Sequence, residues 1–173
     1  MSVVTRRSCP FWVPAAVLVL TVPALWWLHQ RRAGLRSPIP WAAFTLVMVP
    51  FLVDVTGNTL NLYDTVVWWD DFNHWINWLF LLWGIGLLIT DAVHPDWAMV
   101  ALVTGLGAVL AIGWELGEWW TFIRHGTELD TAYEDTLGDL SLGTLGALCA
   151  GFVLLVRRRV GHRHVGETTP EHA

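Results

Sequence analysis

The chain has 173 residues, of which 54% are hydrophobic and only 14% are charged, against roughly 25% charged residues in an ordinary soluble domain. This composition excludes a disordered chain and argues against a water-soluble globule, because one small core could not bury so many apolar side chains. The formal net charge of −5 argues against a nucleic-acid-binding protein. The two cysteines, Cys9 and Cys149, fit neither a metal-binding spacing nor a disulfide framework. We therefore expect a lipid bilayer to be the solvent of this chain.

About five segments are long and apolar enough to cross a bilayer, which takes roughly 20 helical residues. The first covers residues 11–28, and the second starts after Pro40 and continues past Val53. The other three cover residues 72–90, 97–123 and 137–156. The sequence thus predicts an all-α, polytopic transmembrane helical bundle in a single domain, residues 1–156, followed by a polar tail that contains Arg and His, residues 157–173.

The arginines predict how the bundle is oriented in the membrane. An apolar run that follows Arg6 and Arg7 is typical of an export signal, but no convincing cleavage pattern follows Val22, and we expect the first helix to be retained. With five spans, seven arginines lie on one side of the membrane: Arg31, Arg32, Arg36, Arg157, Arg158, Arg159 and Arg163. Three lie on the other: Arg6, Arg7 and Arg124. Because cytoplasmic loops carry the excess of Arg, this count predicts a multi-pass protein of the cell membrane with a cytoplasmic C-terminus.

Conspicuous polar residues gather at four span ends. Because successive spans alternate in direction, the end of the second, the start of the third, the end of the fourth and the start of the fifth lie at one membrane face. These places hold Asp54, Asn58, Asp70, Asp71, His74, Asn77, Glu115, Glu118, Asp135 and Asp139. Ionisable groups near membrane depth normally face a bundle interior or a wet cavity. The sequence therefore predicts an acidic pocket, which the arginine count places at the extracytoplasmic face.

The spacing of these residues predicts metal or acid–base chemistry. Three pairs lie three or four positions apart, so that each shares one helix face: Asp71 with His74, Glu115 with Glu118, and Asp135 with Asp139. Carboxylates and an imidazole without cysteine suit Mg²⁺, Mn²⁺ or Zn²⁺. The expected metal ligands are Asp71, His74, Glu115, Glu118, Asp135 and Asp139. The expected catalytic residues are His74 as a general base, Asp71 as its orienting group, and Glu115.

Plainer explanations remain open for several of these residues. Asp70 and Asp135 lie where acidic residues cap helix N-termini. A glutamate could pair with Arg124, and a proton shared among the carboxylates would explain their crowding as well as a metal does.

Small residues predict close packing of the fourth and fifth spans. Gly113 and Gly117 form a small-xxx-small pair in the fourth span. Gly143, Ala147 and Gly151 form a ladder in the fifth. Such spacing lets helix backbones approach closely in lipid.

A resemblance to known proteins rests on four stretches: YDT at 63–65, WDDFNH at 69–74, WELGE at 114–118 and YEDTLGD at 133–139. They are similar to the YjdF-like family of small bacterial membrane proteins and, more distantly, to the VanZ-like family. The resemblance implies an integral membrane protein without an established biochemical activity. VanZ-like members are linked to resistance to glycopeptide antibiotics of the teicoplanin type.

The VanZ-like pattern has Asp-x-x-His at a helix start, Glu-x-x-Gln on the next helix, and then Asp and Asn before a Gly-rich helix. The matching positions are Asp71, His74, Glu115, Asp135, Gly143 and Gly146. Two positions depart from the pattern, since Glu118 replaces the Gln and Asp139 stands where Asn is usual.

Three functions follow from these observations. The first is a membrane protein whose acidic pocket binds a divalent cation and acts on a lipid-linked or envelope small molecule. The second is a small proton-coupled transporter, and the third is a non-catalytic assembly partner. The expected partners are the bilayer, that small molecule and, as a further option, a second copy of the chain. Acyl transfer is unsupported, because the sequence contains no Gly-x-Ser-x-Gly motif.

Overall fold

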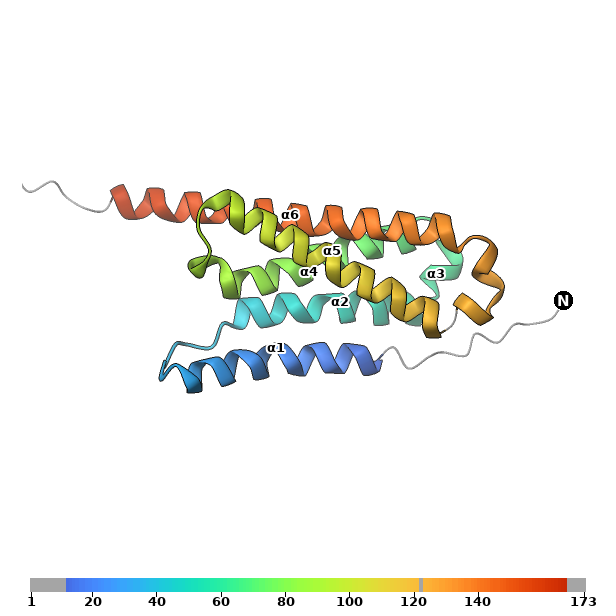
Figure 1. Cartoon of the computed structure of the whole chain (residues 1–173), viewed down its shortest axis with the longest axis horizontal. Helices are drawn as coiled ribbons and strands as arrows, with labels where there is room; N and C mark the ends of the chain where they lie inside the picture. Colours follow the sequence, from blue (N-terminus) through green and yellow to red (C-terminus); the bar gives the residue numbers. More distant parts are fainter. Residues whose placement is uncertain (1–11, 122, 168–173) are drawn as a thin grey trace, which may run out of the picture. The chain divides into compact units, whose positions relative to one another are not determined.

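The computed structural model describes residues 12–121 and 123–167, and these consist of helices and loops without a β-strand (Figure 1). The helices are α1 (Trp12–Arg32), α2 (Trp41–Thr59), α3 (Leu62–Thr65), α4 (Trp69–Ile89), α5 (Asp96–Thr121) and α6 (Ala132–Glu167). Short 3-10 helices η1 (Thr90–Ala92), η2 (Ile123–His125) and η3 (Thr127–Asp130) lie between them. Among the described residues, four helices are long and apolar enough to span a membrane: α2, α4 with η1, α5, and α6 up to Gly161. The predicted all-α membrane bundle is confirmed.

The described residues before Pro40 form a compact unit of their own. Its helix α1 coincides with the first predicted span, whose passage through the membrane stays a prediction. The helix ends at Arg32, and the chain turns away from it at Gly34, whose φ of 65° is the left-handed conformation that suits glycine. The Leu35 amide donates to the Gln30 carbonyl at 2.9 Å and closes the last turn. Arg6, Arg7 and Cys9 lie outside the described residues.

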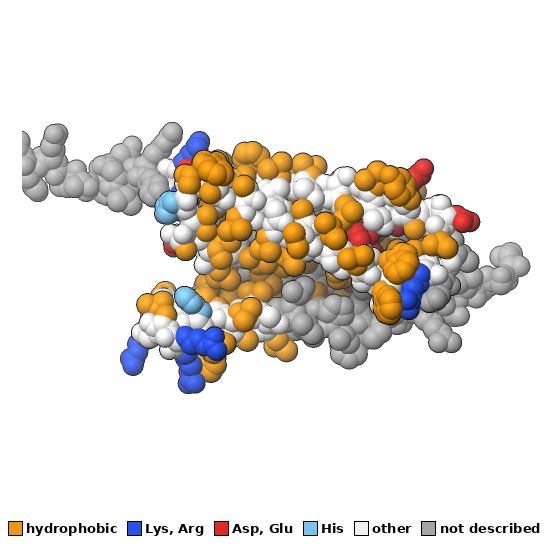
Figure 2. All heavy atoms as spheres, in the orientation of Figure 1, with side chains coloured by type: hydrophobic (Ala, Val, Ile, Leu, Met, Phe, Trp, Pro, Cys, Tyr) orange, Lys and Arg blue, Asp and Glu red, His pale blue; other side chains and the backbone are white. Residues whose placement is uncertain are grey.

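The second unit, residues 40–173, contains the other helices. Within it, α4 packs against α2 and α6, and α6 also packs against α5. The side chains of Val47, Leu82, Met99, Val103 and Leu154 are fully buried between these helices. Large apolar side chains also remain on the outside, as expected of helices that face lipid rather than water. On the face that Figure 2 shows, hydrophobic side chains cover the middle of this unit and charged ones lie toward its ends.

Close packing of α6 rests on small residues. Ala147 of the predicted ladder lies against Gly107 on α5, where an added Cβ atom would overlap it. Gly146, which is outside that ladder, packs against α4, and a Cβ atom added to it would overlap the backbone carbonyl of Trp75. The prediction for Gly113 and Gly117 was wrong, because an added Cβ atom at either position meets no atom within 4 Å. Residues on an α-helix are rotated by about 100° per position, so α5 turns Gly107 toward α6 and Gly113 away from it.

We expect Gly146→Ala to destabilise the protein by about 1–3 kcal/mol, because the new methyl group meets rigid backbone rather than a flexible side chain. Gly113→Ala is the matched control, and it should cost nothing, because its methyl group enters open space. Thermal unfolding in detergent, followed by circular dichroism, measures both variants. Equal melting temperatures for the two variants would contradict this packing.

The last helix is longer than predicted at both ends. It begins at Ala132 instead of residue 137 and continues to Glu167, through much of the predicted tail. Arg158 supplies a physical reason for the extension at the C-terminal end. Its guanidinium donates to the backbone carbonyls of Thr90 at 2.6 Å and Val93 at 3.1 Å, and it pairs with Asp96 at 3.1 Å. A cation thus binds backbone carbonyl groups beyond the end of α4 and ties α6 to the α4–α5 connection.

Candidate metal site

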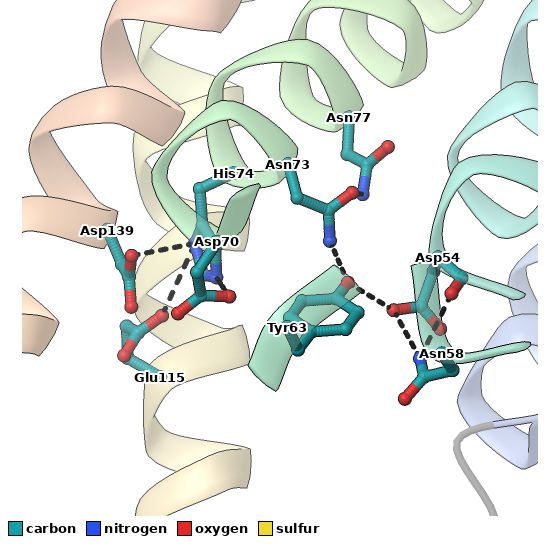
Figure 3. Close-up of polar contacts among 9 residues, drawn as sticks. All are labelled: Asp54, Asn58, Tyr63, Asp70, Asn73, His74, Asn77, Glu115 and Asp139. Carbon is teal, nitrogen blue, oxygen red and sulfur yellow. Dashed lines mark hydrogen bonds and ion pairs between the residues drawn. The ribbon is translucent and has the colours of Figure 1, made fainter. Parts of the chain in front are cut away.

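Three helices bring ionisable residues together near one end of the second unit. His74 comes from α4, Glu115 from α5 and Asp139 from α6, and Figure 3 shows the imidazole facing both carboxylates. His74 lies about 7 Å along the helix axis from the start of α4, and Asp139 lies about 10 Å from the start of α6. The convergence that alternating spans predicted is therefore confirmed for these three residues. Both residues lie within about two helical turns of the helix start.

Burial of these side chains is nearly complete. Glu115 is 6% exposed and Asp139 is 4% exposed, while the His74 side chain is 10% exposed. His74 Nδ1 lies 3.4 Å from Asp139 Oδ1 and 4.0 Å from Glu115 Oε1. On the other side of the ring, Nε2 lies 4.0 Å from Asp70 Oδ1. Buried carboxylates repel one another in an environment of low dielectric, so the arrangement needs protons or a cation to balance it.

The imidazole of His74 has a nitrogen atom whose bonding is incomplete. Nδ1 is buried and makes no hydrogen bond, although it faces Asp139 and Glu115. A buried polar atom without a hydrogen bond is costly and calls for an explanation, such as an ion that completes its bonding.

Two groups of side chains could hold a metal ion. The first consists of Asp70, His74 and Asp139, and the second of Glu115, Glu118 and Asp139. Within each group, one ligand atom per residue lies within 4.8 Å of the others. Ligand atoms at about 2.1 Å from an octahedral cation lie about 3–4 Å apart. Small side-chain rotations would therefore bring the ligand atoms of either group to the spacing that a cation requires. We call these five residues, Asp70, His74, Glu115, Glu118 and Asp139, the acidic cluster.

Two of the expected metal ligands lie outside both groups. Asp71 is exposed, and it lines an apolar groove between α4 and α6 with a volume of about 380 Å³. Asp135 is exposed in the first turn of α6. From the sequence, Asp70 could cap the helix as readily as it could belong to a site. In the structure, Asp70 takes the position beside His74 that we expected for Asp71.

The alternative pairing of the glutamates with Arg124 has no support in the described part of the chain. The Arg124 guanidinium lies 3.7 Å from the centre of the Trp120 ring, a cation–π contact. The ion pairs formed by described residues do not include one between Arg124 and Glu115 or Glu118.

The sequence did not predict a network of side-chain hydrogen bonds that lies next to the acidic cluster. Tyr63 donates to Asp54 Oδ1 at 2.7 Å, and Asn73 Nδ2 donates to the Tyr63 hydroxyl oxygen. Asn77 in turn donates to Asn73 Oδ1 at 2.7 Å, and Asn58 donates to Asp54 Oδ1 at 3.2 Å (Figure 3). Tyr63 belongs to the short helix α3, and its only signal in the sequence was a polar aromatic residue between two spans. These hydrogen bonds hold α2, α3 and α4 together beside His74.

Burial raises the pKa of the Tyr63 hydroxyl above the ordinary value of about 10. The hydrogen bond to Asp54 and the charge of Asp54 raise this pKa further. In a Tyr133→Phe background, which leaves Tyr63 as the sole tyrosine, we therefore expect no phenolate absorbance near pH 10 while the protein is folded. The stability contributed by the protonated hydroxyl is complete below pH 10 and is lost as the pH rises toward the folded-state pKa. A spectroscopic titration measures this, and ordinary titration near pH 10 in the folded state would contradict the contact with Asp54.

Comparisons with known proteins give a family and no activity. Neither a curated protein nor a solved structure matches this chain. Residues 1–160 match the family described as "Predicted membrane protein (DUF2238)". This match covers more than half of the chain, and the protein therefore belongs to that family of membrane proteins.

Proposed function

We propose that the protein binds a divalent cation in the acidic cluster, at the extracytoplasmic face of a bacterial cell membrane, and acts there on a lipid-linked or envelope small molecule. The observation that carries the proposal is the buried His74 nitrogen without a hydrogen bond, which faces two buried carboxylates. Oxygen and imidazole donors suit Mg²⁺, Mn²⁺ or Zn²⁺.

The proposed roles follow from the positions of the side chains. Glu115, Glu118 and Asp139 supply oxygen ligands, and His74 supplies either a nitrogen ligand or a general base. A bound cation would polarise a phosphoryl or carbonyl oxygen of the substrate. Asp70, 4.0 Å from His74 Nε2, would orient the ring, which is the role that the sequence predicted for Asp71.

The groove that Asp71 lines supports a substrate with an apolar part. Trp68, Phe72 and Trp75 line it from the region where α4 begins, and Leu142 and Leu145 line it from α6. Asp71 is the polar residue of this lining. A lipid tail would fit the aromatic walls, while the polar head would lie at the depth of the acidic cluster; Asp71 would contact that head.

The orientation of the protein is part of the proposal. Arg157, Arg158 and Arg159 lie toward the C-terminal end of α6, whereas Asp139 lies near its start. Because an excess of Arg is typical of the cytoplasmic side, these positions support a cytoplasmic C-terminus and an acidic cluster on the opposite side. The YjdF-like and VanZ-like resemblances agree with a bacterial envelope function.

The transporter alternative has less support. A carrier needs polar groups along a path through both halves of the bilayer. Between the acidic cluster and Arg158, the buried side chains include Leu82, Met99, Val103 and Leu154, which offer no such path.

The metal content of the purified full-length protein tests the proposal. After incubation with Mg²⁺, Mn²⁺ or Zn²⁺ and removal of free ions, elemental mass spectrometry should find at least about one ion per chain. His74→Ala and Glu115→Gln should lower that value severalfold. Asp64→Asn removes an exposed acidic residue of α3 and is the control that should retain the wild-type value. If the wild type retains none of the three metals, proton sharing explains the cluster and the proposal fails.

A further inference from the structure

We propose that the acidic cluster holds two divalent cations, which the carboxylate of Asp139 bridges. This inference rests on the proposed function and deepens it, because a pair of cations specifies the class of substrate.

The two groups of potential ligands divide the cluster by helix. Asp70 and His74 come from one side, on α4, while Glu115 and Glu118 come from the other, on α5. Asp139 on α6 is the residue that belongs to both groups. A carboxylate has two oxygen atoms and can offer one to each of two cations. Metal ions in two-metal sites lie about 3.5–4 Å apart, a separation that one bridging carboxylate spans.

The charge of the cluster matches two cations better than one. Glu115, Glu118 and Asp139 are buried or half-buried, and when ionised they carry three negative charges. One divalent cation would leave one of these charges unbalanced, whereas a second cation would balance it.

His74 provides an independent indication that an ion lies next to Asp139. Its side chain is nine-tenths buried, and Nδ1 makes no hydrogen bond. The same atom faces the bridging residue, 3.4 Å from Asp139 Oδ1 (Figure 3). A cation bound between the imidazole and this carboxylate would satisfy the nitrogen without a proton.

Two adjacent cations favour a particular substrate. A pair at this spacing clamps the attacking and leaving oxygens of a phosphoryl group. Together with the apolar groove beside Asp71, the pair fits a phosphate ester of a lipid.

Manganese binding to the full-length protein in detergent tests the inference. Isothermal titration with Mn²⁺ should give two ions per chain, and electron paramagnetic resonance should show a magnetically coupled pair. Glu118→Gln and Asp70→Asn should each reduce the stoichiometry from two ions to one and abolish the coupling. The control Asp64→Asn should keep two coupled ions.

The outcomes separate this inference from the function on which it rests. A single uncoupled ion in the wild type would overturn the pair and leave the proposed function intact. Absence of any bound ion, for Mn²⁺ and also for Mg²⁺ and Zn²⁺, would overturn both. Two ions that persist in Glu118→Gln and in Asp70→Asn would overturn the ligand assignment. The wild-type stoichiometry decides the question even if a variant fails to fold.

Discussion

Replacing Asp139 by Asn should weaken divalent-cation binding at least about tenfold, the largest loss expected of any single substitution in the cluster. The reason is that Asp139 belongs to both groups of potential ligands, whereas each of the other residues belongs to one. Even residues that only orient metal ligands typically contribute 10–100-fold to affinity. Isothermal titration calorimetry with Mn²⁺ on the purified protein measures the change.

Asp64→Asn is the matched control for this substitution. It makes the same chemical change at an exposed position outside the acidic cluster. An affinity of Asp139→Asn within twofold of the control would show that Asp139 is not a ligand.

The same substitution should have the opposite effect on stability when no metal is present. In chelator, the wild-type protein holds two buried carboxylates, Glu115 and Asp139, that repel each other, and Asp139→Asn removes one of them without changing the side-chain size. We therefore expect Asp139→Asn to melt at a higher temperature than wild type in chelator. With cation at about 100 times its Kd, the wild type should gain about 2.7 kcal/mol of unfolding free energy for each bound ion. The variant should gain much less.

Differential scanning fluorimetry in detergent, with and without cation, measures this crossover. Glu134→Gln is a suitable control, because it neutralises an exposed carboxylate near the start of the same helix. A variant that is less stable than wild type in chelator would indicate that Asp139 stabilises the fold directly, which would contradict the repulsion.

Much of the site followed from topology alone. Spans that alternate in direction must return to the same face, so the sequence was enough to place His74, Glu115 and Asp139 near one another. The close packing of α6 was also predictable, because in lipid the backbones of helices approach closely where small residues line one face.

The finer assignments depended on rotation about helix axes, which helical spacing does not determine. Asp70 and Asp71 both lie within one turn of His74, but one position corresponds to about 100° around α4. The packing of α4 against α2 and α6 turns Asp70 toward the cluster and leaves Asp71 exposed in the groove. Gly113 was misassigned to the helix interface for the same reason. Tyr63 was missed because its contact with Asp54 depends on how the connection between two spans folds back.

Anomalous X-ray diffraction from crystals of the full-length protein soaked in Mn²⁺ would show directly whether a cation binds in the acidic cluster. We expect anomalous density within about 2–2.5 Å of the Asp139 carboxylate, flanked by His74 on one side and Glu115 on the other. Density confined to exposed carboxylates such as Asp64, with His74 directly hydrogen-bonded to Asp139, would contradict it.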